Sequence, residues 1–275
     1  NSQSVHNEQL NASGTVNLSN PLEINGPGIQ FAGGTMYFNY DGSSVDELGD
    51  PIYTTLNAST FDLNIGNTVV FGEDHDIHGT GGFRKGASGA YGSGGTIRFL
   101  SGGSTFSGGF RQQSGTLQIG ASSVWKDDAS GTASIWRNGV LVQGNMVSGP
   151  IGTGTLVLAE GGIVAAYSED PAQKSQRISN ALSFGALFTI NKGGPQGERI
   201  IFDTGSANLR NGISDLIITV NSGAIGSFET KLVDAGGNAG GITKNGVGTL
   251  ELANKDNELS AGILVNAGTV KAVQY

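Results

Sequence analysis

The segment Gly95-Thr96-Ile97-Arg98-Phe99 returns twenty residues later as Gly115-Thr116-Leu117-Gln118-Ile119. Each copy reads Gly-Thr, an apolar residue, a variable residue and an apolar residue. This alternation is typical of a half-buried β-strand, because successive side chains of a strand point to opposite faces of its sheet. Seven such copies occur, beginning at Gly14, Gly34, Gly95, Gly115, Gly154, Gly248 and Gly268.

Three pairs of these copies share one spacing. The pairs Thr15 and Thr35, Thr96 and Thr116, and Thr249 and Thr269 are each 20 residues apart. Such a period is the sequence signature of a repeat architecture in which neighbouring units stack. Within each pair, a glycine precedes a further apolar residue, at Ile29, Phe110 and Ile263. Each unit is therefore predicted to run as strand, turn, short strand, turn and strand.

The glycine content agrees with a chain that turns often. Glycine supplies 47 of the 275 residues, well above its average usage of about 7%. Glycine enters left-handed turn conformations at little cost, so frequent turns require many glycines. We expect an all-β fold of parallel coils with the apolar repeat positions facing inward. The predicted inward residues are Val16, Leu18, Ile97, Phe99, Leu117, Ile119, Leu156, Leu158, Leu250, Leu252 and Val270.

The C-terminal copy carries a resemblance to a known family. Residues 240–252 read GGITKNGVGTLEL, and residues 259–270 read LSAGILVNAGTV. They resemble the passenger-associated transport repeat of autotransporters, also called the autotransporter-associated β-strand repeat, which reads G-L-T-K-x-G-x-G-T-L-x-L and then Y-x-G-x-T-x-V-x-x-G-T-L. The resemblance implies a single-stranded, right-handed parallel β-helix (a solenoid), secreted or held on the surface of a Gram-negative-type bacterium. It implies no catalytic residues, because the repeat carries none in that family.

Composition and charge exclude several classes of protein. The 28.0 kDa chain has a net charge of −8 and a pI of about 4.8, which argues against nucleic acid as a partner, because phosphate binding needs clustered Lys and Arg. No apolar run approaches the roughly 18 residues of a membrane span, so we expect no membrane insertion by this segment. The absence of cysteine suits an exported protein that folds without disulfides.

Proline is too scarce and too scattered to mark a linker, so residues 1–275 are predicted to form one continuous β-helix segment. Insertions are predicted near 41–60, 72–95 and 159–177. The last insertion contains Glu, Ala, Gln and Lys with Pro171 near its start, which predicts a short helix within 167–177. The chain begins at Asn1 and stops directly after a repeat strand, so we expect a segment excised from a longer chain, with end-to-end self-association at its open end.

The densest group of possible metal ligands is Glu73-Asp74-His75-Asp76-Ile77-His78. In an extended strand, Asp74, Asp76 and His78 would share one face and could hold a divalent cation through oxygen and imidazole. The alternative is an acidic, solvated loop, and we favour it because ligands that are close in sequence often lack a completing group. We therefore predict no metal and no cofactor.

Two acidic pairs could serve catalysis. They are Asp127-Asp128, beside Trp125, and Glu169-Asp170. β-Helices host polysaccharide lyases and glycosidases, which need carboxylates on neighbouring coils. Adjacent residues of one strand point apart, so neither pair is a ready acid and base. Solvated turns are the favoured interpretation, and we predict no catalytic residues.

Aromatic side chains offer a third kind of site, because exposed rings can stack on sugars. The candidates are Trp125, Trp136, Tyr37, Tyr40, Tyr53, Tyr91 and Tyr167. A core or end-cap role is the more frequent one for such residues. The glycine-rich stretch 191–197 lacks the Gly-Lys-Ser/Thr ending of a phosphate loop and is set aside.

The predicted function is therefore a non-enzymatic, surface-displayed or secreted segment, a stalk or adhesin that supports export and binds host or environmental glycans or proteins. Two alternatives stay open, a polysaccharide-active enzyme on the same scaffold and a lectin-like glycan-binding module. A carboxylate cluster across coils in a groove would indicate the enzyme, and an exposed aromatic row would indicate the lectin. The preference rests partly on family analogy, because fold alone does not settle function.

Overall fold

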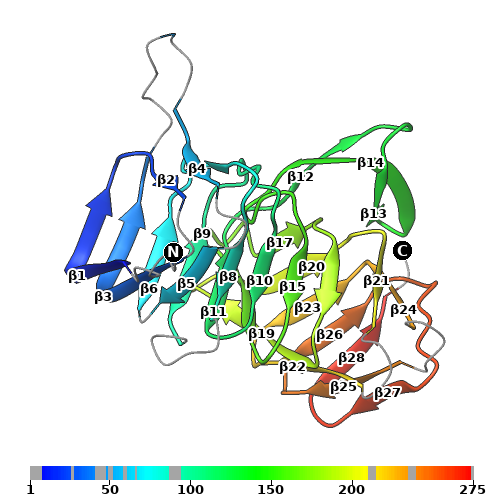
Figure 1. Ribbon diagram of the computed structural model, residues 1–275. Coiled ribbons are helices and arrows are strands. Elements are labelled where there is room, and N and C mark those ends of the chain that lie inside the picture. Colours follow the sequence, from blue (N-terminus) through cyan, green and yellow to red (C-terminus); the bar gives the residue numbers. More distant parts are fainter. Residues whose placement is uncertain are drawn as a thin grey trace, which may run out of the picture.

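The computed structural model describes residues 8–25, 28–40, 48, 52–57, 61–65, 67–86, 94–209, 215–234 and 240–273. Within these ranges every regular element is a β-strand, and there is no helix (Figure 1). Almost all neighbouring strands pair in parallel, so the chain is an all-β protein built from long parallel sheets.

Two long strands, β1 (Glu8–Leu18) and β3 (Gly28–Phe38), join the two arms of one 15-stranded sheet, and we call these arms sheet 1 and sheet 2. The first half of β3 pairs with β5, and its second half pairs with β6. Sheet 1 continues from the first halves through β5 (Phe61–Ile65), β8 (Phe83–Lys85), β10 (Phe110–Gln112), β15 (Leu156–Leu158) and β18 (Leu182–Phe184). Sheet 2 continues from the second halves through β6 (Thr68–Phe71), β9 (Thr96–Phe99), β11 (Thr116–Ile119), β16 (Ile163–Tyr167), β19 (Leu187–Gly193), β22 (Leu216–Val220), β25 (Gly241–Asn245) and β27 (Gly262–Val265).

A third sheet begins at residue 175 and closes the circuits of the C-terminal part. Sheet 3 consists of β17 (Ser175–Ile178), β20 (Arg199–Phe202), β23 (Ile225–Phe228), β26 (Thr249–Leu252) and β28 (Thr269–Ala272). Smaller sheets are formed by β2 (Glu23–Ile24), β4 (Thr54–Leu56) and β7 (Ile77–His78), and by β21 (Ser206–Asn208) and β24 (Lys231–Val233). From β15 to β20 the chain runs twice through sheet 1, sheet 2 and sheet 3, and we call one such passage a circuit. In earlier circuits β2, β4 and β7 occupy the third side, and after β18 the strands β21 and β24 stand between sheet 3 and sheet 2 where sheet 1 stood before.

The 20-residue spacing of the three repeat pairs is confirmed as the sequence separation between paired strands of neighbouring circuits, whereas other neighbouring circuits are longer, as the pairing of Thr68 with Thr96 shows. Thr15 pairs with Thr35, Thr96 with Thr116, and Thr249 with Thr269. The copies nevertheless fall in all three sheets, because Thr116 opens β11 of sheet 2, Leu156 lies in β15 of sheet 1, and Thr249 opens β26 of sheet 3. The Gly-Thr motif thus marks the start of a strand and does not indicate to which of the three sheets that strand belongs.

The core lies between the sheets and is lined by the apolar repeat positions. Of the predicted inward residues, Ile97, Phe99, Leu117, Ile119, Leu156, Leu158, Leu250 and Leu252 are buried. Val16, Leu18 and Val270 pack against the core and are partly buried. Phe38, Phe71 and Phe99 form an aromatic stack on successive strands of sheet 2, with ring centroids 5.0 and 5.1 Å apart.

Polar side chains inside the core satisfy the carbonyl groups of the turns. The fully buried Lys244 donates from Nζ to the carbonyl oxygens of Asn245, Gly246 and Ala267, at 2.8, 2.7 and 3.1 Å. The first two belong to its own turn and the third to the next circuit. Gly246 adopts φ 74°, and a Cβ there would lie 2.3 Å from the Val220 carbonyl oxygen. In the Lys-x-Gly of the repeat, the glycine therefore forms the turn, and the lysine side chain caps the carbonyl groups of that turn from inside the core.

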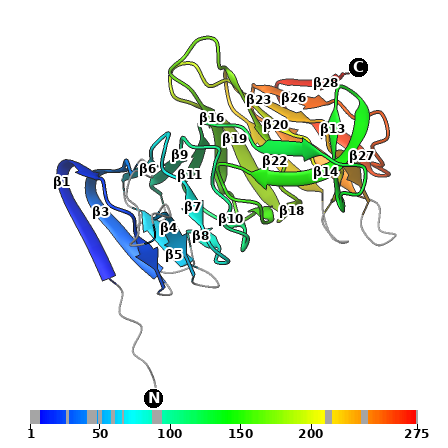
Figure 2. The ribbon, with the colours of Figure 1, turned by 90° about the horizontal axis from the view of Figure 1, so that it is seen from above.

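A three-stranded antiparallel sheet, which we call the hairpin, extends from the circuits between β11 and β15. It consists of β12 (Val124–Asp127), β13 (Ala133–Arg137) and β14 (Val140–Ser148), paired antiparallel (Figure 2). β13 and β14 are joined by a turn at Asn138 and Gly139, which adopt φ values of 52° and 77°. Trp136 ties the hairpin to the circuits, since its backbone N–H donates to the Asp203 carbonyl and its Nε1 to the Gly205 carbonyl.

The predicted helix within 167–177 is wrong. Ser168 Oγ accepts from the Asp170 N–H, Asp170 Oδ1 accepts from the Ala172 N–H, and β17 begins at Ser175. These side-chain hydrogen bonds favour a tight turn over a helix, because they give the backbone alternative partners. The ranges predicted as insertions contain circuit strands, namely β4 in 41–60, β7 and β8 in 72–95, and β16 and β17 in 159–177. Parts of the first two ranges, 41–47 and 87–93 among them, lie outside the described residues.

Candidate functional site

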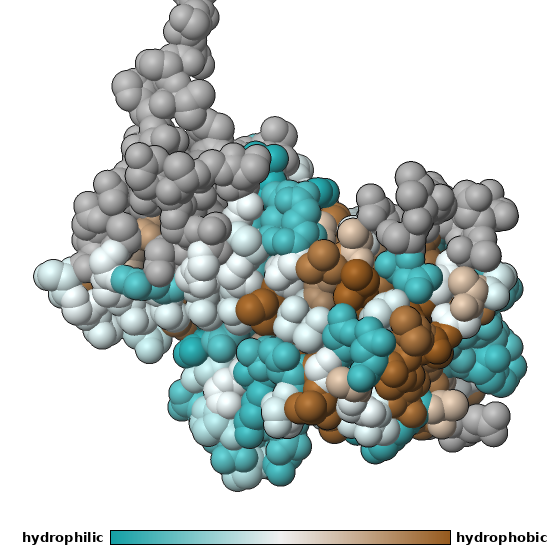
Figure 3. All heavy atoms as spheres, turned by 90° about the horizontal axis from the view of Figure 1, so that it is seen from below, coloured by the Kyte–Doolittle hydropathy of each residue, from teal (hydrophilic) through white to brown (hydrophobic). Residues whose placement is uncertain are grey.

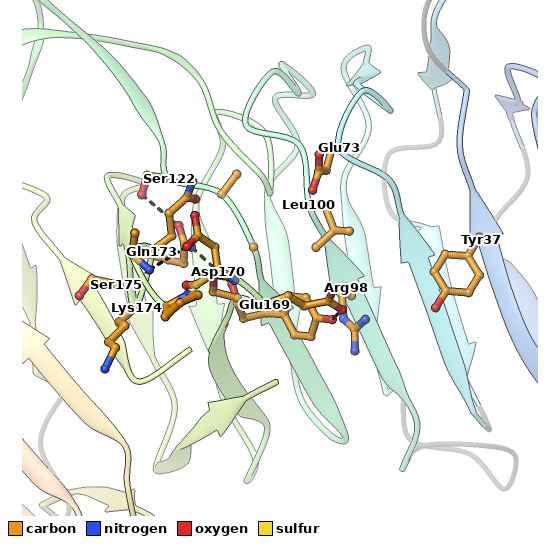
Figure 4. Close-up of a pocket in the computed structure, with 17 residues that line it drawn as sticks. Tyr37, Glu73, Arg98, Leu100, Ser122, Glu169, Asp170, Gln173, Lys174 and Ser175 are labelled. Atoms are coloured by element: carbon orange, nitrogen blue, oxygen red, sulfur yellow. Dashed lines mark hydrogen bonds between the residues drawn. The ribbon is translucent and has the colours of Figure 1, made fainter. Parts of the chain in front are cut away.

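A groove of about 940 Å³ runs along the outer face of sheet 2 (Figure 4). Its lining comes from successive strands and from the turn after β16. The residues are Tyr37, Glu73, Arg98, Leu100, Gly120, Ala121, Ser122 and the stretch 167–176. The sheet supplies a floor of fixed geometry and the turn supplies one wall, so the groove is open and elongated.

Arg98 and Tyr167 form the floor of the groove. Arg98 lies between the inward-facing Ile97 and Phe99, so strand alternation directs it outward. Its guanidinium carbon lies 3.7 Å from the centre of the Tyr167 ring, and its Nε donates to Gln118 Oε1 at 2.7 Å. Such a cation–π contact and the hydrogen bond hold the guanidinium flat on the sheet. No hydrogen-bond partner of its two Nη atoms is found in the part of the chain that the structure describes, so both are available to a ligand.

The wall begins where the chain leaves β16. Tyr167 OH donates to Glu169 Oε1, while the carboxylate of Asp170 caps the turn at Ala172. Burial raises the pKa of Tyr167, and the hydrogen bond to Glu169 raises it further, so the phenol stays neutral at physiological pH. Glu169, Asp170 and Lys174 are exposed along this wall.

The charges in the groove nearly balance. Arg98 and Lys174 are cationic, and Glu73, Glu169 and Asp170 are anionic. Lys174 pairs with Glu198 at 3.5 Å. Among the described residues, no carboxylate lies within 4.0 Å of the Arg98 guanidinium, so this cation remains free to bind a ligand.

The residues considered as metal ligands, and set aside in favour of a solvated loop, do not come together. Asp74 is exposed, Asp76 Oδ1 accepts from Ser101 Oγ, and His78 Nδ1 lies 3.0 Å from Thr105 Oγ1. A turn at residues 73–74 replaces the extended strand that would align them. Within the ranges that the structure describes, no three His, Cys, Asp or Glu side chains gather as they would around a metal ion.

The neighbouring His75 has a structural position. It is buried beside Phe38, Phe71 and Tyr40, and its Nδ1 accepts from the Tyr40 backbone N–H at 3.2 Å. Burial lowers its pKa to about 4, although the charge of Asp76 acts in the opposite direction. The imidazole therefore closes the core at this corner in its neutral form.

The acidic pairs lie in turns or on exposed edges. Asp128 accepts from both the backbone N–H and the Oγ of Ser130, which lowers its pKa, and it closes the turn before Gly131. Asp127 forms an exposed ion pair with Arg137 at 3.5 Å. Glu169 and Asp170 form part of the groove wall, so only this second pair reaches the candidate site.

Of the aromatic candidates that the structure describes, only Tyr37 and Tyr167 line the groove. Tyr40 is buried against His75, and Tyr53 stacks on His78 with ring centres 4.0 Å apart. Trp125 and Trp136 belong to the hairpin, and Tyr91 lies outside the described residues. The described candidates therefore do not form one row.

The outer face of sheet 3 holds a charged cluster that the sequence did not predict. Arg177 Nη1 donates to Asp203 Oδ2 at 2.9 Å, and its two Nη atoms donate to Glu229 at 2.8 and 3.0 Å. Arg199 forms a two-point pair with Glu251 at 2.6 and 3.2 Å. We call these five residues the ion-pair ladder. Its carboxylates come from successive circuits, and the only sequence signal is a charge at outward positions of the strands.

The carboxylates of the ladder are closed to solvent, while the Arg177 and Arg199 side chains are 26% and 31% exposed. The Asp203, Glu229 and Glu251 side chains are 0%, 3% and 5% exposed. Burial raises the pKa of Asp203, and Arg177 counteracts this. A substrate atom has no access to such carboxylates, so their arrangement serves to tie circuits together.

Comparison with known proteins finds no matching family, no similar curated protein and no similar solved structure. No helix long and apolar enough to cross a membrane occurs among the described residues.

Proposed function

We propose that this chain is a non-enzymatic structural and binding segment, a single-stranded, right-handed parallel β-helix whose outer face presents the groove. The observation that carries the proposal is the pairing of the 20-residue repeats, Thr15 with Thr35 and Thr96 with Thr116. A period that equals one circuit extends a scaffold, because each unit contacts mainly its neighbours and can be added without new chemistry.

We propose further that the segment is displayed on, or secreted from, a Gram-negative-type bacterium as part of an autotransporter passenger. The support is the resemblance of residues 240–272 to the passenger repeat. The buried Lys244 gives that motif a physical role, since it ties its own turn to the next circuit. A chain without cysteine also depends on no disulfide for folding after export.

The enzymatic alternative has one observation in its favour, the carboxylates on successive circuits of sheet 3. Their geometry weighs against it. A general acid or base must reach the reacting proton within about 3 Å. Asp203 and Glu229 are buried and bonded to Arg177. Of the exposed carboxylates of the groove, Glu73 stands on a different element from Glu169 and Asp170, and Glu169 is bonded to Tyr167. No histidine is found among the described residues that line the groove.

Two measurements test the proposal. Antibodies against this chain should label intact cells of the source organism, and protease added outside should remove the signal. Purified protein incubated with pectin, mucin glycans and plant polysaccharides should release no reducing ends or unsaturated products. Labelling only after lysis would reject surface display. Turnover that is lost on Asp203→Asn or Asp170→Asn, in a folded variant, would reject the non-enzymatic role.

A further inference from the structure

Three features of the groove indicate a class of ligand. They are its length, the balance of charges in its lining and an aromatic ring at one end. We propose that the groove binds a neutral polysaccharide chain that runs along the stack of circuits, across the strands of sheet 2. This inference rests on the proposed role of the chain as a binding segment and names the ligand of that role.

The length of the groove follows the stacking of the strands. Tyr37, Arg98 and Tyr167 lie on β3, β9 and β16, and four strand-to-strand steps separate β3 from β16 in sheet 2. Neighbouring strands are about 4.8 Å apart, so the lining spans about 19 Å. A linear chain of sugar rings repeats at a length close to this spacing. Successive rings would therefore meet successive strands in equivalent positions.

The charges of the lining oppose highly charged ligands of either sign. Glu73, Glu169 and Asp170 would repel a polyanion, while Arg98 and Lys174 would repel a polycation. Sugar hydroxyls both donate and accept hydrogen bonds, so they match carboxylates and a guanidinium equally well. Ser122, Gln173 and Ser175 add neutral polar groups to the same lining (Figure 4).

Arg98 is the residue around which we expect binding to be organised. Tyr167 and Gln118 fix its guanidinium before any ligand arrives. A donor fixed in this way loses little conformational entropy on binding. Its free Nη atoms form a fork that can donate to two neighbouring sugar oxygens, which a lysine cannot do in the same geometry.

Tyr37 supplies a second anchor. Its ring is half-buried on the outer face of β3, apart from the Tyr167–Arg98 pair (Figure 4). Tyr37 pairs in register with Val70, which pairs with Arg98, so the two anchors lie in one column, about 10 Å apart. A ring at this position can pack against the C–H face of a sugar.

Isothermal titration calorimetry with the whole chain tests the proposal. The neutral probes are hexasaccharides of glucose, xylose, mannose and N-acetylglucosamine. A galacturonic acid hexamer and hexalysine are the charged probes. We expect at least one neutral probe to bind and neither charged probe to do so. Arg98→Gln and Tyr37→Ala should each weaken binding at least about tenfold, which corresponds to about 1.4 kcal/mol.

The matched control is Arg137→Gln, which removes a guanidinium from the hairpin and should leave binding unchanged. Arg98→Lys keeps the charge and stem but removes the fork, so it should weaken binding as Arg98→Gln does. Circular dichroism and the thermal midpoint confirm that each variant is folded.

Several outcomes would overturn the proposal. These are failure of every neutral probe to bind at millimolar concentration, tighter binding of the acidic hexamer or of hexalysine, or binding that Arg98→Gln and Tyr37→Ala leave unchanged. Surface labelling of intact cells does not depend on the groove. If labelling succeeds and no sugar binds, the ligand class is wrong and the display role stands.

Discussion

The N-terminal circuits and the C-terminal circuits are both stacks of paired strands, but different interactions stabilise the two stacks. From β3 to β9, the third side of each circuit is only two or three residues long, in β4 and β7, and large aromatic side chains fill the core. From β17 to β28, sheet 3 is built from strands of four residues, and the ion-pair ladder binds its outer face. Short strands leave few positions for outer ladders, so the N-terminal circuits depend more on their core.

The two ends of the stack also differ at their surfaces. Figure 3 shows apolar side chains gathered over the half where the C-terminal circuits lie, while much of the described surface over the other half is polar. On β27, Ile263, Leu264 and Val265 are 37%, 57% and 46% exposed. The same repeat therefore buries its apolar positions where another circuit follows and leaves them more exposed at the last described circuit.

The largest expected effect is at the centre of the aromatic stack. Phe71→Ala removes a buried ring between Phe38 and Phe99, and it should lower the free energy of unfolding by about 3–5 kcal/mol through lost burial and a cavity. Urea unfolding measures the loss.

The matched variant is Phe228→Ala, whose ring stacks on Phe202 in the C-terminal circuits. Because each circuit contacts mainly its neighbours, native-state hydrogen exchange should show lost protection near residues 67–86 for the first variant and near 199–228 for the second. Equal loss along the whole stack in both variants would contradict two separable regions.

The next effect is a dependence of stability on pH that arises in the N-terminal circuits. His75, in the N-terminal circuits, has a reference pKa of 6.5 and a folded pKa of about 4. Between these values the unfolded chain binds a proton that the folded chain does not. The stability that the neutral His75 contributes is therefore fully present above about pH 6.5. It decreases as the pH falls, and it does not decrease further below about pH 4. The shift corresponds to about 3 kcal/mol.

His75→Asn supplies the control, because an amide oxygen can still accept from the Tyr40 N–H and does not titrate. Urea midpoints of the parent and the variant should converge as the pH falls from 7 to 4. A constant difference between them over this range would show that His75 does not titrate on unfolding.

A smaller loss is expected from the ion-pair ladder. Arg177→Ala leaves Asp203 and Glu229 buried without their shared partner and should cost about 2–3 kcal/mol, since hydrogen bonds to charged groups contribute about this much. Burial already raises the pKa of Asp203, and a raised carboxyl pKa favours the fold at low pH. The cost should therefore be greater at pH 7 than at pH 4. Arg137→Ala, from an exposed pair, is the control.

The sequence predicted the repeated register but not the sites built across it. Thr96 and Thr116 are separated by one period without an insertion, so their pairing follows from spacing alone. Arg177 and Glu229 are 52 residues apart in sequence, and Tyr167 reaches Arg98 only after the hairpin has lengthened a circuit. Variable circuit lengths remove the fixed period that would place such partners. The predicted helix failed for a local reason, the side-chain caps of Ser168 and Asp170.

The smallest effect on stability is expected in the hairpin, which belongs to neither the N-terminal nor the C-terminal circuits. Asp127 and Arg137 form a 3.5 Å pair whose side chains are 60% and 42% exposed. Water screens such a pair, and holding two mobile side chains together offsets much of the attraction. Asp127→Asn should therefore change the free energy of unfolding by less than about 0.5 kcal/mol. A double-mutant cycle with Arg137→Gln measures the coupling between the two residues directly. Coupling above about 1 kcal/mol would mean that the hairpin is held more rigidly than its exposure suggests, and that it contributes to the stack as the circuits do.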